Sequence, residues 1–319
     1  MTPTGSTWTG GDPGVRWQKR GHVYVPPGDA EWAQQYAFPP TPHRRDDDVL
    51  RLYVAFCDSD TVGRVGYVDV QADAPERIVE VSPQPVLDVG APGMFDEYGV
   101  VPTCVVPVED RLFMYYVGYQ RGSKVSYFQF QGLAVSSDGG ESFERVQRVP
   151  VLDRSDAEPL NRTSAFVRRS GDGFQMWYVG GGEWTTVGDK PLPVYNLRYI
   201  ESPDGVSWPG EGTVCLDFGN DDEHAFGRPW VWEDEDGLAM LYSVRTRSKD
   251  YRLGFARSAD GVTWERRDEE VGIDVSPSGW DSEMIAYGSV VRSGDRVYLF
   301  YNGNGRGRTG FGYAELERA

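Results

Sequence analysis

The hydrophobic pattern of this chain consists of short apolar and aromatic runs separated by polar turns. Five of these runs resemble one another and begin about 60 residues apart, at 52–56, 114–118, 176–180, 240–244 and 299–303. Each run is short and rich in β-branched or aromatic residues, which is typical of a strand. A turn rich in Asp, Gly and Ser precedes most runs, and a further apolar run precedes the turn. The pattern therefore predicts a repeated antiparallel hairpin.

A third apolar segment follows each aromatic run, at 64–68, 131–135, 197–200, 253–256 and 310–314. In three repeats it leads into a Ser-x-Asp-Gly turn and then an aromatic residue, at 136–143, 202–208 and 258–264. Ser and Asp side chains can bond the amides of such a turn, and Gly takes its positive-φ position. We interpret this turn as one that its own side chains stabilise, and whose role is to connect two strands rather than to bind a ligand. A fourth strand is expected after it.

The last repeat ends after its third strand, whereas an unassigned segment at the other end of the chain resembles a fourth strand. Residues 17–25 match the pattern of 143–151. We therefore expect the N-terminal strand to complete the last repeat, which would leave no open edge between first and last units. The sequence predicts an all-β fold, a five-bladed β-propeller closed by an N-terminal strand. Its expected organisation is a flexible N-terminal segment at 1–14 and a single domain at 15–319.

Composition narrows the functional classes. The chain of 319 residues carries 39 Gly and 21 Pro, which suits a fold with many turns. Its formal net charge of −17 disfavours partners with phosphate backbones or anionic membranes. The three Cys are widely separated, so we expect buried free thiols rather than a disulfide framework or a zinc knuckle. No run has the pattern of a signal peptide or the length of a membrane span, and a cytoplasmic location is expected.

The repeats, the Ser-x-Asp-Gly turns, the Arg228-Pro229 pair and the acids before the inner strands together resemble the five-bladed glycosidase superfamily. That superfamily includes glycoside hydrolase families 43, 32, 62, 117 and 130, and the resemblance covers residues 15–317. It implies one acid in each of the first three blades, acting as base or nucleophile, pKa modulator and general acid. Asp96 or Glu97 matches the second acid and Glu158 the third. The first blade has Gln35 and its neighbour where an Asp is expected, and an amide cannot act as a base.

Unusual polar residues gather in the segments that we expect at one face of the ring, before the inner strands and after the aromatic runs. The candidate catalytic residues are Glu97, Glu158, Glu283 and His224. The candidate substrate-binding residues are Gln35, Asp96, Arg162, Trp184, Glu223, Arg228, Arg245, Asp281 and Asn302. Carboxylates near one another can raise a pKa and create a general acid, and arginines can hold an anionic group. Each residue also has a structural interpretation, in which acids bond backbone amides and Trp side chains pack between blades. No spacing indicates a metal site, and no cofactor is expected.

These features predict a carbohydrate-active enzyme, of glycoside hydrolase or phosphorylase type, that cleaves or transfers a glycosidic bond of a small anionic sugar. The expected ligand is a small-molecule carbohydrate that is phosphorylated or nucleotide-linked, with no nucleic acid or membrane partner. Two alternatives stay open. One is a sugar-binding propeller without chemistry, which the blade-one Gln residues favour. The other is a biosynthetic lyase, isomerase or transferase in the same pocket, because fold does not determine chemistry.

Overall fold

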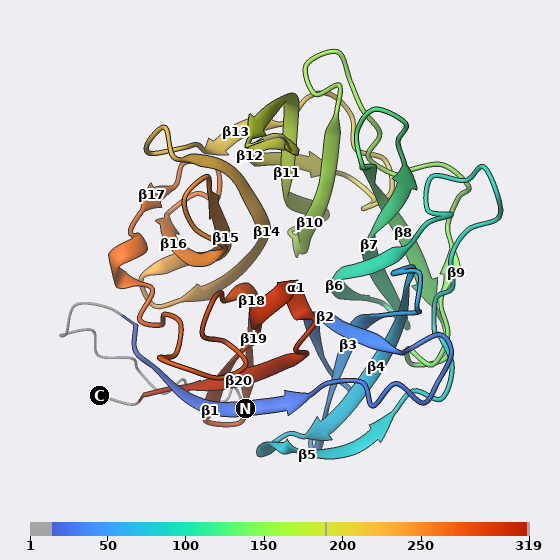
Figure 1. Cartoon of the computed structure of the whole chain (residues 1–319), viewed down its shortest axis with the longest axis vertical. Helices are drawn as coiled ribbons and strands as arrows, with labels where there is room; N and C mark the ends of the chain where they lie inside the picture. Colours follow the sequence, from blue (N-terminus) through green and yellow to red (C-terminus); the bar gives the residue numbers. More distant parts are fainter. Residues whose placement is uncertain (1–14, 189, 318–319) are drawn as a thin grey trace.

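Short strands follow one another along the chain, as the repeated apolar runs predict. The computed structural model describes residues 15–188 and 190–317, so the expected flexible segment 1–14 lies outside the described residues. The strands are arranged in sheets around a common centre (Figure 1). This is an all-β fold of the β-propeller type.

The strands pair in antiparallel groups of consecutive strands, which we name by their strands. The β2–β5 group comprises β2 (Gln35–Arg44), β3 (Val49–Cys57), β4 (Gly63–Gln71) and β5 (Ala74–Val81). The β6–β9 group comprises β6 (Val100–Val108), β7 (Arg111–Arg121), β8 (Tyr127–Ser136) and β9 (Glu144–Arg145). The β10–β13 group comprises β10 (Asn161–Ser170), β11 (Gly173–Val187), β12 (Lys190–Ser202) and β13 (Thr213–Leu216).

The β14–β17 group follows the same order, with β14 (Glu223–Asp234), β15 (Gly237–Thr246), β16 (Arg252–Ser258) and β17 (Glu265–Arg266). The last strands of the chain are β18 (Ala286–Ser293), β19 (Arg296–Asn302) and β20 (Phe311–Leu316). A 3₁₀ turn, Asp268–Glu270, follows β17, and a short helix, α1 (Asn304–Gly307), connects β19 to β20.

The N-terminal strand β1 (Trp17–Tyr24) pairs antiparallel with β20, from Trp17 opposite Leu316 to Tyr24 opposite Phe311. Figure 1 shows the two strands side by side. This pairing confirms the prediction that the N-terminal strand supplies the fourth strand of the last group. The edge of β20 is therefore covered by chain from the opposite end of the sequence.

The first strand of each group lies nearest the centre of the ring in Figure 1, where β2, β6, β10, β14 and β18 converge. The register between each of these strands and its neighbour shifts near the middle, as at a β-bulge. Tyr36, Arg228 and Tyr287 have positive φ at or beside these shifts, at 60°, 34° and 58°. A bulge turns a side chain away from the regular alternation of a strand. The bulges thus direct particular side chains toward the centre of the molecule.

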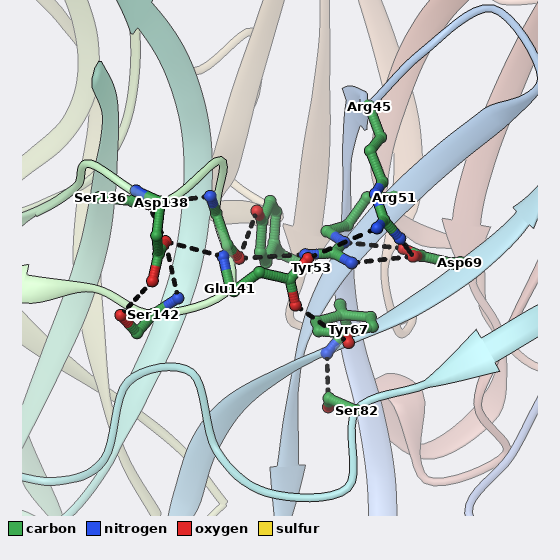
Figure 2. A network of polar contacts seen from close by, with 11 residues as sticks. Arg45, Arg51, Tyr53, Tyr67, Asp69, Ser82, Ser136, Asp138, Glu141 and Ser142 are labelled. Atoms are coloured by element: carbon green, nitrogen blue, oxygen red, sulfur yellow. Dashed lines mark hydrogen bonds and ion pairs between the residues drawn. The ribbon is translucent and has the colours of Figure 1, made fainter. Parts of the chain in front are cut away.

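The Ser-x-Asp-Gly turns are stabilised by hydrogen bonds to their own Ser and Asp side chains, as the sequence predicts. At the turn after β8, the Ser136 hydroxyl accepts hydrogen bonds from the amides of Asp138 and Gly140, at 3.3 and 2.8 Å. The Asp138 carboxylate accepts from the amides of Glu141 and Ser142, at 3.0 and 3.1 Å (Figure 2). The turns after β12 and β16 repeat this pattern.

Each of these three turns also joins its own group to the one before it. The Tyr53 hydroxyl of β3 donates to the Gly140 carbonyl in the turn after β8, at 3.0 Å. Tyr115 of β7 and Trp177 of β11 donate to the corresponding glycine carbonyls after β12 and β16, at 2.6 and 2.7 Å. The repeated aromatic run and the repeated turn are therefore two halves of one contact between neighbouring groups.

Figure 2 shows a network of polar contacts at the junction between the β2–β5 and β6–β9 groups. Arg51 is fully buried and forms two hydrogen bonds with Asp69, at 2.8 and 2.9 Å. Its guanidinium lies 3.6 Å from the centre of the Tyr67 ring and pairs with Glu141 across the junction, at 2.8 Å. A buried charge is tolerated only when it is paired and hydrogen-bonded, and Arg51 meets both conditions.

Cys57, Cys104 and Cys215 are buried free thiols, as expected. Burial raises the pKa of each thiol to about 12, so none is a reactive thiolate near neutral pH. Among the described residues, no helix is long and apolar enough to cross a membrane.

Candidate functional site

Most of the acids that precede inner strands are buried and bound by a tyrosine hydroxyl and a basic side chain. We call this arrangement of acid, tyrosine and base a clamp. Asp96 is fully buried, and its Oδ2 accepts hydrogen bonds from the Tyr116 hydroxyl at 2.9 Å and from Arg145 at 2.7 Å. Glu158 is also fully buried and accepts from the Tyr178 hydroxyl at 2.9 Å. Two arginines flank it, Arg162 at 3.0 Å and Arg198 at 3.4 Å.

The same arrangement occurs in the two later groups. Asp281 accepts from the Tyr301 hydroxyl at 3.0 Å and pairs with Lys19 of β1 at 2.6 Å. In the β14–β17 group the Tyr242 hydroxyl donates to Asp268 at 2.5 Å, and Arg266 bridges Asp268 and Glu223. Burial alone raises the pKa of Glu223, but hydrogen bonds from Arg266 and from the Gly219 amide lower it below the usual value.

This placement differs from the expectation that the inner-strand acids face a substrate. Asp96, Glu158, Glu223 and Asp281 come from different groups, and each is at least nine-tenths buried and paired with a basic side chain. Arg162 belongs to the Glu158 clamp and also donates to the carbonyls of residues 153 and 210. These predicted site residues therefore form hydrogen bonds and ion pairs within their own groups, which stabilise the fold.

Arg228 lies among the inner strands at the centre of the ring. Its guanidinium donates to the Tyr287 carbonyl at 2.7 Å, the Thr41 hydroxyl at 2.9 Å and the Thr103 carbonyl at 3.2 Å. These three acceptors belong to β18, β2 and β6. Arg228 is 2% exposed and forms no ion pair with a described carboxylate, and burial lowers its pKa to about 9. A positive charge without a carboxylate partner therefore stands at the centre.

A set of tyrosines from different groups lies around this centre, and we call it the axial cluster. Tyr251 and Tyr287 have ring centres 5.6 Å apart, and Tyr119 and Tyr127 have ring centres 5.7 Å apart. Tyr195 of β12 completes the cluster, since Tyr251, Tyr127 and Tyr287 all lie close enough to raise its pKa. Burial and the neighbouring tyrosines raise the pKa of Tyr195 and Tyr287 well above the usual value. These hydroxyls therefore remain protonated hydrogen-bond donors.

Two arginines adjoin the axial cluster, and neither forms an ion pair with a described carboxylate. The guanidinium of Arg245, from β15, lies 5.7 Å from the centre of the Tyr251 ring. Arg306, from α1, lies close enough to Tyr287 and Tyr127 for its positive charge to favour their ionised forms. The carboxylate of Asp250 in turn favours the charged form of Arg306, which contributes to the raised pKa of that arginine. Within the described part of the chain, neither guanidinium has an ion pair or a side-chain hydrogen bond. Protonated phenols and unpaired guanidinium groups are the donors that an anionic ligand requires.

His224 of β14 is 1% exposed and lies near these arginines. Its Nδ1 is 3.3 Å from the Pro193 carbonyl, while its buried Nε2 has no partner among the described residues. Burial, together with Arg245 and Arg247, lowers the pKa of His224 despite the hydrogen bond to Pro193. The carbonyl can only accept, so Nδ1 carries the proton and Nε2 is free to accept one.

The other predicted catalytic acids are more accessible. Glu97 is half-buried and accepts a hydrogen bond from the Gly93 amide at 2.6 Å. Glu283 is exposed, and its carboxylate has no partner among the described side chains. Its neighbour Met284 packs with Tyr251 and Tyr287 of the axial cluster. Of the predicted acids, Glu283 therefore combines accessibility with a position in the chain next to a residue that packs on the cluster.

The remaining predicted residues have mixed surroundings. Gln35 donates to the Asp58 carbonyl at 2.9 Å, and the fully buried Asn302 donates to the carbonyls of Ala37 and Gly310, both at 2.8 Å. Trp184 is half-buried beside Tyr127, with ring centres 6.5 Å apart. Trp184 therefore adjoins the axial cluster, whereas Gln35 and Asn302 support backbone.

The axial tyrosines are the main residues that sequence reasoning missed. They belong to β7, β8, β12, the segment before β16, and β18, and no local motif connects them. No group of three or more His, Cys, Asp or Glu side chains suited to a metal ion occurs within residues 15–188 and 190–317.

Comparisons with known proteins place this geometry in context. No model of a known protein family matches the chain. The chain is 34% identical over 303 residues to the uncharacterized protein Rv1502 of Mycobacterium tuberculosis strain H37Rv, covering 95% of this chain and 100% of the relative. Protein MT1551 of M. tuberculosis strain CDC 1551 matches equally, at 34% over 303 residues. The chain belongs to the family of these mycobacterial proteins.

Several solved structures share the fold. A glycoside hydrolase superposes with a TM-score of 0.73 at 20% identity, covering 95% of this chain and 92% of its own. A thermostable family-43 glycoside hydrolase gives a TM-score of 0.64 at 16% identity, with 92% and 91% covered. A GH130 glycoside hydrolase, described as targeting β-1,2 mannosidic linkages in Candida mannan, gives 0.69 at 15% identity, with 95% and 94% covered. The fold is that of the propeller glycosidases, as the sequence resemblance implies.

Proposed function

We propose that this protein is a carbohydrate-active enzyme of glycosidase type, which cleaves or transfers a glycosidic bond of a small anionic sugar at the axial cluster. In this proposal the antiparallel groups are the blades of a five-bladed propeller, and residues 15–319 form one domain. The observation that carries the proposal is the pair Arg245 and Arg306, which stand beside protonated tyrosines without a carboxylate held in an ion pair. The glycosidase fold of the structural neighbours supports the sugar class.

The chemistry has two candidate groups. Glu283 is the accessible acid that precedes Met284, which packs on the cluster, and Glu283 would donate a proton to the leaving glycosidic oxygen. The unpartnered Nε2 of His224 would accept a proton from the attacking water or acceptor hydroxyl. Aromatic side chains such as Trp184 would pack on the apolar face of the sugar.

The test compares glucuronate with glucose, and nitrophenyl glucuronide with nitrophenyl glucoside. Arg245→Gln should weaken glucuronate binding about 10-fold or more in calorimetry, since hydrogen bonds to charged groups contribute about 1.5–3 kcal/mol. Weak glucose binding should be unchanged. Arg20→Gln, which removes an exposed pair with Glu315, is the matched control. Equal binding of the acid and the neutral sugar by the unaltered protein would refute the anionic substrate class.

A second candidate function is sugar binding without chemistry. The observation that favours it is the sequestration of Asp96 and Glu158, the two acids that the glycosidase resemblance would make catalytic. Glu283→Gln separates the two functions. In an enzyme it should lower turnover about 100-fold while binding persists, whereas a binding protein should show no turnover in either form.

A further inference from the structure

Tyr287 has the least usual backbone among the tyrosines of the axial cluster. It lies in the β18 bulge with a φ of 58°, a left-handed conformation that residues with a bulky side chain rarely adopt. Its neighbour Ala286 and residues 288–290 are buried, whereas Tyr287 is half-buried. The bulge therefore turns this one side chain out of the buried pattern of its strand.

Side chains from two other strands hold both peptide groups of Tyr287. The guanidinium of Arg228, from β14, donates to the Tyr287 carbonyl at 2.7 Å. The hydroxyl of Ser243, from β15, accepts from the Tyr287 amide at 2.8 Å. Arg228 is itself anchored on Thr41 and Thr103, and Ser243 is fully buried. A rare backbone conformation persists only where its surroundings fix it, and these two side chains do so for Tyr287.

The corresponding bulges of β2 and β10 lack this double hold. Tyr36 and Ser164 have φ of 60° and 52° at these bulges. Within residues 15–188 and 190–317, no side chain forms a hydrogen bond with the backbone of either residue. The nearest parallel is Asn302, which donates to the carbonyl of Ala37, beside Tyr36. A bulge alone does not require such contacts, so the hold on Tyr287 indicates a need to direct its side chain.

The ring of Tyr287 is packed on its sides, and its hydroxyl is free. The ring centre lies 5.6 Å from that of Tyr251 and 6.4 Å from that of Phe38. A Cβ on Gly227 would lie 3.7 Å from the Tyr287 ring, which is ordinary contact. The hydroxyl has no hydrogen-bond partner among the described residues, and the positive charge of Arg306 lies close enough to favour its ionised form. A fixed ring thus presents a phenol donor beside a guanidinium, as recognition of an anion requires.

We propose that Tyr287 donates a hydrogen bond to the substrate in the axial cluster, and that Arg228 and Ser243 are positioning residues that direct its hydroxyl. The hydroxyl lies at the far end of the side chain, so a small rotation of the backbone displaces it widely. Misplacement of a group by about 1 Å can cost about 100-fold in rate. The proposal rests on the proposed function for its ligand, whereas the hold on Tyr287 can be tested without one. It also gives Arg228, predicted to bind substrate, an indirect role through Tyr287.

The first experiment needs no ligand and uses NMR of the full chain labelled with ¹³C at the tyrosine Cζ atoms. Tyr287→Phe identifies the Tyr287 signal by its loss. Ser243→Ala should shift this signal, and Ser243→Thr, which keeps a hydroxyl, should return it toward its original position. Ser293→Ala is the matched control, because it removes a buried hydroxyl at the other end of β18 that donates to the Ala72 carbonyl. A Tyr287 signal that Ser243→Ala leaves in place, or that Ser293→Ala shifts as much, would overturn the positioning role.

The second experiment measures glucuronate binding by calorimetry. Tyr287→Phe should weaken binding about 10-fold, as expected for the loss of one hydrogen bond to a charged group. Ser243→Ala should weaken it about 3-fold or more when Tyr287 is present and have no further effect in Tyr287→Phe, because it acts through the phenol hydroxyl. Equal losses from Ser243→Ala with and without that hydroxyl would show a general structural effect and contradict the proposal. Arg228→Lys should show the same dependence on Tyr287, and the Ser243 variant remains informative if Arg228→Lys fails to fold.

The outcomes separate this proposal from the proposed function. Unchanged glucuronate binding in Tyr287→Phe, alongside weakened binding in Arg245→Gln, would overturn the role of Tyr287 and leave the axial site intact. If the unaltered protein binds glucuronate and glucose equally, the anionic class fails, yet Tyr287→Phe should still weaken binding of both. If it binds neither, the substrate contact of Tyr287 fails with the proposed function, and the NMR result alone decides the role of Arg228 and Ser243.

Discussion

At the scale of single residues, Tyr116 differs from Phe by one hydroxyl, which donates to the buried carboxylate of Asp96 at 2.9 Å. Tyr116→Phe should lower the free energy of unfolding by about 1–3 kcal/mol, because a buried acceptor loses a donor that water cannot replace. The Oδ1 atom of Asp96 already has no partner among the described residues, so the carboxylate has little means of compensation. Urea denaturation monitored by fluorescence measures this difference.

Tyr127→Phe is the control for the clamp. Tyr127 is half-buried in the axial cluster, and its hydroxyl donates to no described group. Its removal should change the free energy of unfolding by less than about 0.5 kcal/mol. Similar losses for Tyr116 and Tyr127 would show that the hydrogen bond to Asp96 does not stabilise the fold.

The clamps also show what the sequence could reveal about the acids. Their spacing from the aromatic runs was available, since Asp96, Glu158 and Asp281 each precede a tyrosine by 20 residues. Read with the strand pattern, this spacing indicates a repeated contact within a sheet. The predicted roles were instead catalysis for Glu158 and substrate binding for Asp96 and Asp281. The base of each clamp comes from a variable distance along the chain, so spacing alone could not identify it.

At the scale of elements, the turn after β8 depends on the charge of Asp138. Burial alone raises its pKa, but hydrogen bonds involving Ser136 and Ser142 lower it to about 2. An unfolded Asp has a pKa of about 3.9, so the folded state favours the ionised form. This contribution to stability is complete above about pH 4 and is lost as the pH falls toward about 2.

Asp138→Asn should therefore reduce stability at neutral pH, and the difference from the unaltered protein should disappear as the pH approaches about 2. Thermal unfolding at a series of pH values measures it. Asp172→Asn, in the exposed turn between β10 and β11, provides the comparison. A difference that stays constant from neutral to acid pH would show that the charge of Asp138 is not what stabilises the turn.

Strands and turns were predictable because their signals are local. Alternation, Gly at positive φ and the Ser-x-Asp-Gly pattern all act within a few residues. The axial cluster lacks such a signal, since Tyr119, Tyr195 and Tyr287 meet only because strands from different groups converge, in the case of Tyr287 through a bulged strand. Bulges depend on the pairing of a strand with its neighbour, and the sequence pattern of one strand does not locate them.

At the scale of the whole molecule, the N-terminal strand β1 both pairs with the last strand and supplies basic side chains to ion pairs. Lys19 of this strand supplies the base for the Asp281 clamp, and Arg20 pairs with Glu315 of β20. Tyr24 of the same strand packs against Phe56 of β3, with ring centres 6.0 Å apart. The N-terminal strand therefore closes the ring, completes the Asp281 clamp and contacts the β2–β5 group.

Deletion of residues 1–25 should accordingly destabilise the molecule as a whole. It exposes the edge of β20, leaves Asp281 buried without Lys19, and uncovers Trp17, which is 8% exposed in the core. Breaking a buried pair by removing one partner costs about 3–5 kcal/mol, and the lost strand adds to this. The melting temperature should fall by more than about 10 °C. Deletion of residues 1–14 leaves β1 intact and should melt close to the full chain. If both truncated proteins melt at the temperature of the full chain, β1 does not hold the ring closed, and the remaining sheets are stable with an open edge.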